Sequence, residues 1–131
     1  MRLVTTHLES GAESHRARCD QFAEVLADDA HMLAGDFNIR DSEVRQDMSV
    51  QNWRDSLVVS GQDAEHRYTW DAHRNTRVPR SPFSRPRFRF DRMYVRNNDV
   101  IQISRFNLLT NKVGDTHPSD HFALLASVSL R

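Results

Sequence analysis

Residues 31–38 have the sequence HMLAGDFN, and this stretch decides the kind of fold. Residues 31–34 are a brief apolar run that Gly35 ends, which is the pattern of a buried strand that stops in a turn. The polar residues 36–41 that follow are expected to form a loop. Asp36 and Asn38 are therefore expected at the end of a buried strand.

Further strands and one helix are expected on both sides of this stretch. The expected strands are residues 3–8, 31–34, 68–70, 88–95, 100–109 and 121–130. A helix is expected over residues 11–28, because Ser10 and Glu13 have the spacing of a capping box and Phe22 and Leu26 share one helical face. The remaining segments are residues 53–59, helical or irregular, and the loops 71–86 and 110–118. This order predicts an α/β or α+β class.

The composition limits the size and setting of the protein. Its 131 residues, 38% hydrophobic and 27% charged, suit one globular domain or a piece of a larger one. No apolar run approaches the roughly 18 residues of a membrane span, so we expect no membrane partner. Cys19 is the only cysteine, which excludes a disulfide within the chain and favours an intracellular setting, nuclear in a eukaryote or cytoplasmic in a bacterium.

The charges are unevenly distributed although the formal net charge is zero. Between Arg74 and Arg96 there are eight arginines and one acidic residue, Asp91, which gives this stretch a charge of +7. Such a concentration of positive charge attracts phosphate groups. The alternative is a solvated arginine-rich loop that reflects only a preference for arginine over lysine.

Three short polar clusters follow apolar segments at expected strand ends: residues 35–38 (GDFN), 90–92 (FDR) and 119–121 (SDH). Aspartates at such places are often ordinary turn residues. Asp91 differs, because it interrupts an alternation of Phe, Met and Val that should be half-buried, and a buried carboxylate needs a partner. Arg89 or Arg92 could be that partner at the surface, and a histidine could be that partner in a site.

Aspartates, an asparagine and a histidine together suit the attack of water on a phosphodiester. That reaction needs a base for the water, a divalent cation, and donors that face the developing charge on phosphorus. Hard carboxylate oxygens favour Mg²⁺ or Mn²⁺ over zinc. The residues by themselves leave open whether the clusters form an active site or a set of turns.

Five segments in order resemble the endonuclease/exonuclease/phosphatase superfamily, and among its branches the 5′-tyrosyl-DNA phosphodiesterases. They are residues 6–10 (THLES), 35–41 (GDFNIRD), 68–71 (YTWD), 89–94 (RFDRMY) and 118–121 (PSDH). Each motif alone has low specificity, but five in the family's order, over nearly the whole chain, are a specific match.

The resemblance implies a role for each matching residue. Asp36 would orient or deprotonate the attacking water, and Asn38 would hold this water and a phosphate oxygen. His121 would contact the scissile phosphate, with Asp91 as the buried partner that fixes its ring. His7 would be a second phosphate contact.

The same resemblance implies a metal ligand and two contacts to nucleic acid. Asp120 would lie beside a magnesium ion and help to hold its hydration shell. Arg40 would pair with a phosphate and Trp70 would stack on a base. Trp70 could equally be a plain core aromatic residue.

The implied fold is the C-terminal half of a four-layer αββα sandwich of the DNase I-like type. The family's N-terminal half supplies a phosphate-binding asparagine and a metal-binding glutamate, and neither has a counterpart in residues 1–131. We therefore expect a partial domain that needs this missing half or a self-association partner, and that alone binds Mg²⁺ weakly and catalyses poorly.

The implied function is Mg²⁺-dependent hydrolysis of phosphodiesters at 5′-blocked DNA ends, with 5′-tyrosyl-DNA as the expected substrate. Two alternatives remain. One is another branch of the superfamily, such as a sugar- or lipid-phosphate phosphatase or an abasic-site nuclease. The other is a non-catalytic fragment that binds nucleic acid.

Overall fold

A four-stranded sheet forms the centre of the protein, as seen in the computed structural model, which describes residues 1–47, 52–61, 67–97 and 100–131. The strand order is β1-β2-β6-β3, with β1 parallel to β2 and with β6 antiparallel to both β2 and β3. The strands are β1 (Leu3–His7), β2 (Met32–Asp36), β3 (Trp53–Asp55) and β6 (Asp91–Arg96).

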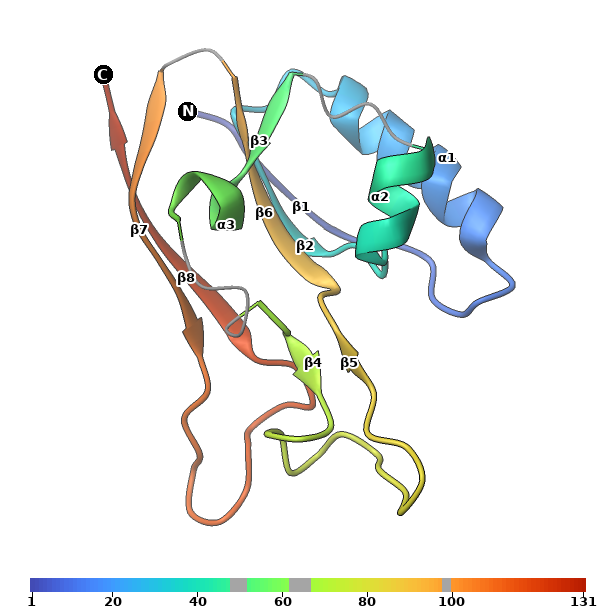
Figure 1. Cartoon of the computed structure of the whole chain (residues 1–131). Helices are drawn as coiled ribbons and strands as arrows, with labels where there is room; N and C mark the ends of the chain where they lie inside the picture. The colour runs from blue at the N-terminus through green and yellow to red at the C-terminus, as the bar shows by residue number, and fades with distance from the viewer. Residues whose placement is uncertain (48–51, 62–66, 98–99) are drawn as a thin grey trace.

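Helices α1 (His15–Ala27) and α2 (Asp41–Asp47) cover one face of this sheet (Figure 1). The core beneath them is built on three buried rings, those of Phe22, Phe37 and Tyr94. The Phe37 ring stands edge-on to the other two, with centroid distances of 5.3 and 5.5 Å, a favoured arrangement of aromatic rings. This core fixes α1 against the ends of β2 and β6.

A two-stranded antiparallel ribbon, β7 (Ile101–Leu109) and β8 (Ala123–Leu130), packs on the opposite face. Its Ile101 forms a second buried cluster with Met32 and Val95. The result is three layers: helices, sheet and ribbon. A short helix, α3 (Ser56–Val59), follows β3.

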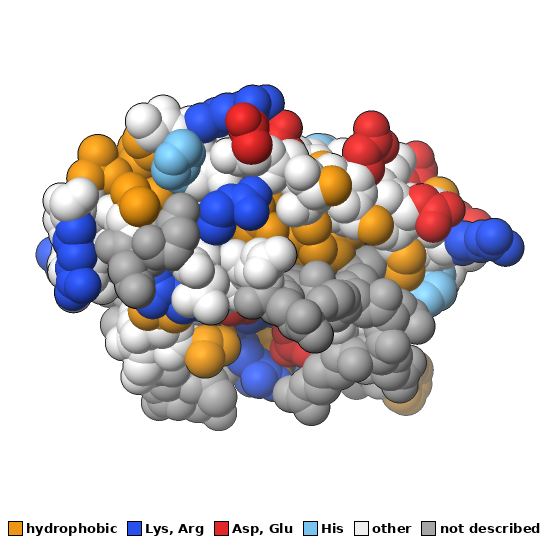
Figure 2. All heavy atoms as spheres, turned by 90° about the horizontal axis from the view of Figure 1, so that it is seen from above, with side chains coloured by type: hydrophobic (Ala, Val, Ile, Leu, Met, Phe, Trp, Pro, Cys, Tyr) orange, Lys and Arg blue, Asp and Glu red, His pale blue; other side chains and the backbone are white. Residues whose placement is uncertain are grey.

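A small hairpin, β4 (Trp70–Asp71) and β5 (Arg87–Phe88), extends beyond the end of the sheet at which β2 ends and β6 begins (Figure 1). In the described structure, β1 pairs only with β2, and β8 pairs only with β7. Near the opposite end, seen from above in Figure 2, apolar side chains are exposed among charged ones. Leu3 and Leu130 are 57% and 59% exposed. Within the described residues, no helix combines the length and apolarity needed to cross a membrane.

The predicted mixed α and β class is confirmed, but three local expectations are wrong. Residues 53–59 were expected to be helical or irregular, yet residues 53–55 form β3. The helix expected over residues 11–28 begins only at His15, and the capping box does not form; Ser14 is the N-cap residue and its side chain makes no capping bond. The buried side chain of Arg18 donates instead to the carbonyls of Glu9 and Gly11, which holds this segment as a loop. Helix α2, directly after the expected loop, was not anticipated.

Candidate active site

The ends of β1 and β2 and the start of β6 lie side by side, which brings together residues that are far apart in the sequence. The register pairs His7 with Asp36 across β1 and β2, and Asp36 with Asp91 across β2 and β6. Gly35 makes the first pairing possible, because a Cβ atom there would lie 2.0 Å from the carbonyl oxygen of Thr6. The glycine in the opening sequence motif is therefore required by the approach of β1.

His121, just before β8, completes a group with Asp36 and Asp91. Its Nδ1 lies 2.7 Å from Asp91 Oδ2, and its Nε2 lies 3.9 Å from Asp36 Oδ2. His7 Nε2 is 3.5 Å from the same Asp36 oxygen, but the His7 side chain is 75% exposed. The partner that Asp91 requires is thus a histidine.

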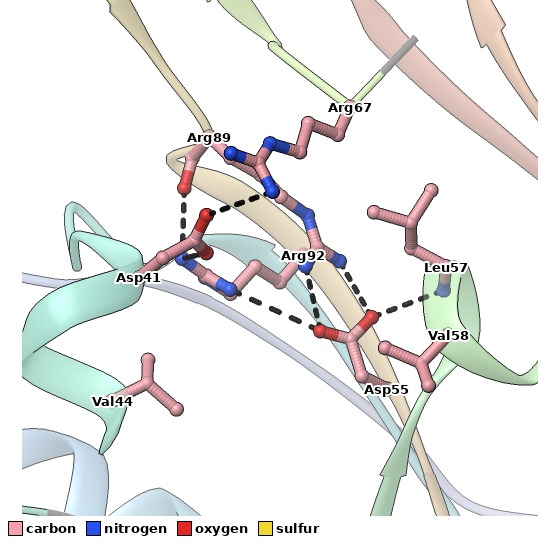
Figure 3. Close-up of a pocket in the computed structure, with 8 residues that line it drawn as sticks. All are labelled: Asp41, Val44, Asp55, Leu57, Val58, Arg67, Arg89 and Arg92. Atoms are coloured by element: carbon pink, nitrogen blue, oxygen red, sulfur yellow. Dashed lines mark hydrogen bonds and ion pairs between the residues drawn. The ribbon is translucent and has the colours of Figure 1, made fainter. Parts of the chain in front are cut away.

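The two arginines that could have paired with Asp91 have other partners. Arg89 binds Asp55 through both of its terminal nitrogens, and Arg92 donates to Asp41 (Figure 3). The cavity of about 210 Å³ beside these ion pairs shares no lining residue with the cleft next to His121. Asp91 therefore remains available to His121.

The surroundings shift the proton affinities of two groups in the site. Burial raises the pKa of Asp36 above its ordinary value, and the Asp91 carboxylate acts in the same direction. The backbone N–H of Asn38, which donates to Asp36 Oδ1 at 2.8 Å, opposes this rise only in part. The hydrogen bond to Asp91 raises the pKa of His121. Asp36 is thus a stronger base than an ordinary aspartate, and the charged imidazolium of His121 is favoured.

Asn38 is held in an unusual backbone conformation beside the cleft. Its φ of 51° lies in the left-handed region, which asparagine tolerates better than most residues. The side-chain amide donates to the carbonyl of Leu8 at 2.8 Å. A cleft of about 290 Å³ is lined by Gly11, Ala12, Arg18, Asn38, Arg40, Trp70, Phe90 and His121.

The rings of Trp70, Phe90 and His121 line this cleft, and the Phe88 ring packs on those of Trp70 and Phe90. Trp70 stacks on Phe88 at 6.0 Å, Phe88 stacks on Phe90 at 5.0 Å, and Phe90 lies 6.3 Å from the His121 ring. The guanidinium of Arg40 lies over the Phe88 ring at 5.2 Å. Trp70 is only half-buried, so it is not a plain core residue.

Asp120 lies at the edge of the site rather than in the group around His121. It is exposed, and its Oδ2 accepts a hydrogen bond from the indole nitrogen of Trp70 at 3.3 Å. Asn75 donates to the carbonyls of Ser119 and Asp120, both at 3.0 Å, and so fixes this turn. The structure therefore brings Asp120 next to Trp70.

The described residues contain one group that could hold a metal ion, formed by Asp36, Asp91 and His121, whose donor atoms lie within 4.8 Å of one another. Two of these donors already bind each other. Mg²⁺ prefers six oxygen ligands and commonly keeps several waters. The group therefore suits an ion that stays largely hydrated or takes oxygen ligands from a substrate.

Sequence reasoning missed two residues that support the site. Thr69 is fully buried, and its Oγ1 accepts hydrogen bonds from the backbone N–H groups of Phe90 and Asp91 at 3.1 and 3.0 Å. Asn75 lies in the segment 71–86, which we expected to be a loop. The one available signal for Thr69 was its place in the quoted YTWD segment.

The arginine-rich stretch is divided between the interior and the surface. Arg87, Arg89, Arg92 and Arg96 bond to groups within the protein. Arg74, Arg77, Arg80 and Arg85 are exposed on the long loop between β4 and β5. About half of the positive charge inferred from the sequence therefore faces solvent.

Comparison with known proteins connects this geometry to a family. No family model matches the chain. The 5′-tyrosyl-DNA phosphodiesterase of Caenorhabditis briggsae is 30% identical over 138 residues, which cover 97% of this chain and 38% of that protein. Tyrosyl-DNA phosphodiesterase 2 of Gallus gallus is 31% identical over 142 residues, covering 94% of this chain and 36% of that protein.

Solved structures agree with these sequence matches. The crystal structure of D. rerio TDP2 complexed with single-strand DNA product superimposes with a TM-score of 0.83 at 27% identity, covering 97% of this chain and 55% of that chain. The human nocturnin catalytic domain, at 18% identity and a TM-score of 0.64, shares the fold. The chain thus spans about half of the matched structures and just over a third of the curated relatives.

The fold of the chain matches about half of the DNase I-like domain of the endonuclease/exonuclease/phosphatase superfamily. The chain is similar to members of this superfamily, and its likeness to the 5′-tyrosyl-DNA phosphodiesterases extends over nearly all of its length. The resemblance noted from the five motifs is confirmed.

Proposed function

We propose that the chain carries the part of a Mg²⁺- or Mn²⁺-dependent phosphodiesterase that handles water and phosphate, with DNA blocked by tyrosine at a 5′ end as the substrate. The observation that carries this proposal is the Asp36–Asp91–His121 group beside a cleft walled by aromatic rings. The likeness to tyrosyl-DNA phosphodiesterases supports the choice of substrate.

Asp36 and His121 take complementary parts in this proposal. Asp36, whose raised pKa makes it a better base, orients or deprotonates the attacking water. Asp91 accepts a hydrogen bond from the Nδ1–H group of His121 and so directs Nε2 toward Asp36 and the scissile phosphate. Asn38 holds the water and a phosphate oxygen, and His7 is a second phosphate contact. The charged form of His121 stabilises negative charge as the phosphate reacts.

The nucleic-acid strand would follow the aromatic wall away from this group. Trp70 offers a half-buried indole for stacking on a base, and the exposed Arg40 offers a charge for a phosphate. The solved D. rerio TDP2 complex holds a single-strand DNA product, which supports a nucleic-acid ligand for this related chain.

A divalent ion would be held next to Asp36, with Asp120 binding its waters at the edge of the site. When bound, such an ion stabilises charge on the phosphoryl oxygens. Asp120 suits an outer role, because it is exposed and its Oδ2 already accepts the Trp70 indole hydrogen. The group around His121 contains only two carboxylates, and for this reason we propose that this chain alone binds a divalent ion weakly.

We further propose that residues 1–131 are part of a domain that other protein segments complete, either an N-terminal half or a second copy. The singly paired strands β1 and β8 and the exposed Leu3, Leu125 and Leu130 support this view. Sedimentation over a range of concentrations distinguishes the two sources, since self-association depends on the concentration of this chain alone. A chain that stays monomeric and fully active would contradict the proposal.

The test of function is hydrolysis of a 5′-phosphotyrosyl oligonucleotide with and without Mg²⁺, using the chain alone and fused to the N-terminal half of a relative. Activity should require the metal and be lost in Asp36→Asn and His121→Ala. The matched controls Asp20→Asn and His73→Ala change exposed residues and should keep it. Activity only on a phosphosugar, a phosphoinositide or abasic DNA would replace the proposed substrate. Oligonucleotide binding without any hydrolysis would indicate a non-catalytic binding protein.

A further inference from the structure

Arg92 is buried behind the site, and its side-chain hydrogen bonds within the described structure go to Ile39, Asp41 and Arg89 rather than into the cleft. It follows Asp91 in β6, and successive strand residues point to opposite faces of a sheet. The side chain is 2% exposed, and it lies within the ion-pair cluster of Figure 3 rather than in the cleft next to His121.

One nitrogen of Arg92 links two segments that carry site residues. Its Nη2 donates to the carbonyl of Ile39 at 2.9 Å and to Asp41 Oδ1 at 2.8 Å, and it lies 3.1 Å from the carbonyl of Arg89. Ile39 stands between Asn38 and Arg40 in the loop after β2. The guanidinium therefore links this loop to β6, whose first residue is Asp91.

The loop needs such support because of the backbone conformation of Asn38. A non-glycine residue in the left-handed region is retained only where surrounding contacts determine it. On one side the Asn38 amide binds the carbonyl of Leu8, and on the other side Arg92 binds the next carbonyl along the chain. The two contacts together define where the Asn38 amide and the Arg40 side chain stand.

A charged group this deeply buried is costly unless it is paired and hydrogen-bonded. Burial alone would raise the pKa of Asp41, but the charge and hydrogen bond of Arg92 lower it below its ordinary value. Asp55 binds Arg89 and lies 3.9 Å from Arg92 Nη1, so the cluster is held from both ends (Figure 3). The arrangement therefore keeps Arg92 in one position.

We propose that Arg92 is a positioning residue for the phosphodiesterase reaction. It fixes the positions of Asn38 and Arg40 relative to Asp91 and does not itself contact the substrate. The inference rests on the proposed function for its kinetic part only. Loss of Arg92 should lower kcat much more than it changes KM, since a displacement of about 1 Å can cost roughly 100-fold in rate.

The test compares Arg92→Met, Arg92→Lys and the control Arg96→Met in the fused, active protein. Arg96 lies in the same strand and donates to the backbone carbonyls of Ala30 and Asp28, away from the site. We expect kcat to fall about 10- to 100-fold in Arg92→Met, with partial recovery in Arg92→Lys and no change in Arg96→Met. Unchanged kcat in both Arg92 variants, or an equal fall in Arg96→Met, would overturn the proposal.

Hydrogen exchange provides a readout that does not depend on activity. In Arg92→Met, amides of residues 38–41 should exchange faster than in the wild type while those of α1 remain protected. Uniformly faster exchange would show a general loss of stability and contradict a positioning role. If Arg92→Met does not fold, Arg92→Lys is used for the same measurement. If the wild type proves inactive on every substrate, the proposed function fails, and faster exchange confined to residues 38–41 still supports the link between Arg92 and this loop.

Discussion

Replacing Thr69 by valine should destabilise the protein strongly, although the two side chains have nearly the same shape. Thr69 is fully buried, and its Oγ1 accepts hydrogen bonds from the backbone N–H groups of both Phe90 and Asp91. Valine fills the same space but offers no acceptor. Each N–H group left without a partner costs about 1–3 kcal/mol.

The expected loss in the free energy of unfolding is therefore about 2–6 kcal/mol, a large part of the roughly 5–15 kcal/mol typical of a folded domain. Thr69→Ser is the matched comparison, because it keeps the hydroxyl and removes one methyl group. That change should cost only about 1 kcal/mol. The order of stability should be threonine, serine, then valine.

Urea unfolding followed by circular dichroism measures both variants. A valine variant within about 1 kcal/mol of the wild type, or less destabilised than the serine variant, would refute the hydrogen-bonding role of Thr69. A second readout follows from the position of Asp91. Because Thr69 holds the backbone of Asp91, the valine variant should also disturb the Asp91–His121 bond and shift the His121 ring signals in NMR spectra.

Three further outcomes follow from the site. Asp91 raises the pKa of His121, so His121 stays protonated until the pH rises above its ordinary pKa of 6.5. Asp91→Asn should lower this pKa and move the alkaline limb of the kcat/KM profile to lower pH. An unshifted limb would contradict this assignment. Trp70→Ala should weaken the binding of single-stranded DNA roughly 5- to 150-fold in fluorescence anisotropy, and an unchanged affinity would exclude stacking. Gly35→Ala should destabilise the protein by about 3 kcal/mol or more in urea unfolding, because its Cβ would meet the Thr6 carbonyl oxygen at 2.0 Å; normal stability would show that β1 can move away.

Much of the sheet could be predicted, because β1 is rich in β-branched residues, β2 is a short apolar run that ends at a glycine, and β6 lies in a segment where Phe and Met residues are separated by arginines. The three-residue strand β3 was not predicted. The need of Asp91 for a partner also followed from its place in an alternating strand, although the choice between arginine and histidine required the structure. Helix α2 could not be found in this way, because its described part is polar apart from Val44, which alone packs on the core. Without an apolar stripe, the helical period leaves no signal.

The supporting residues were missed for a different physical reason. The bonds of Thr69 and Asn75 join side chains to backbone groups 21 to 45 positions away in the sequence. Contacts of that range have no period and no fixed spacing. The ion pairs of the buried Arg89 and Arg92 could not be predicted for the same reason, since their partners Asp55 and Asp41 lie on other elements. A count of charges along the chain therefore overstated the charge available to a phosphate.

The charges around the cleft give a physical reason for a divalent cation in the proposed phosphodiesterase site. Asp36 and Asp91 together carry more negative charge than protonated His121 offsets, and Asp120 adds to the excess at the edge. Arg18 also lines the cleft, but its guanidinium is paired with Glu43. A phosphodiester entering here would meet repulsion from these carboxylates, and attraction from His121, from Arg40 and from the exposed arginines of the loop between β4 and β5. The carboxylates around Asp36 would thus oppose substrate binding, and a hydrated divalent ion would relieve that conflict because its charge attracts both the carboxylates and the phosphate.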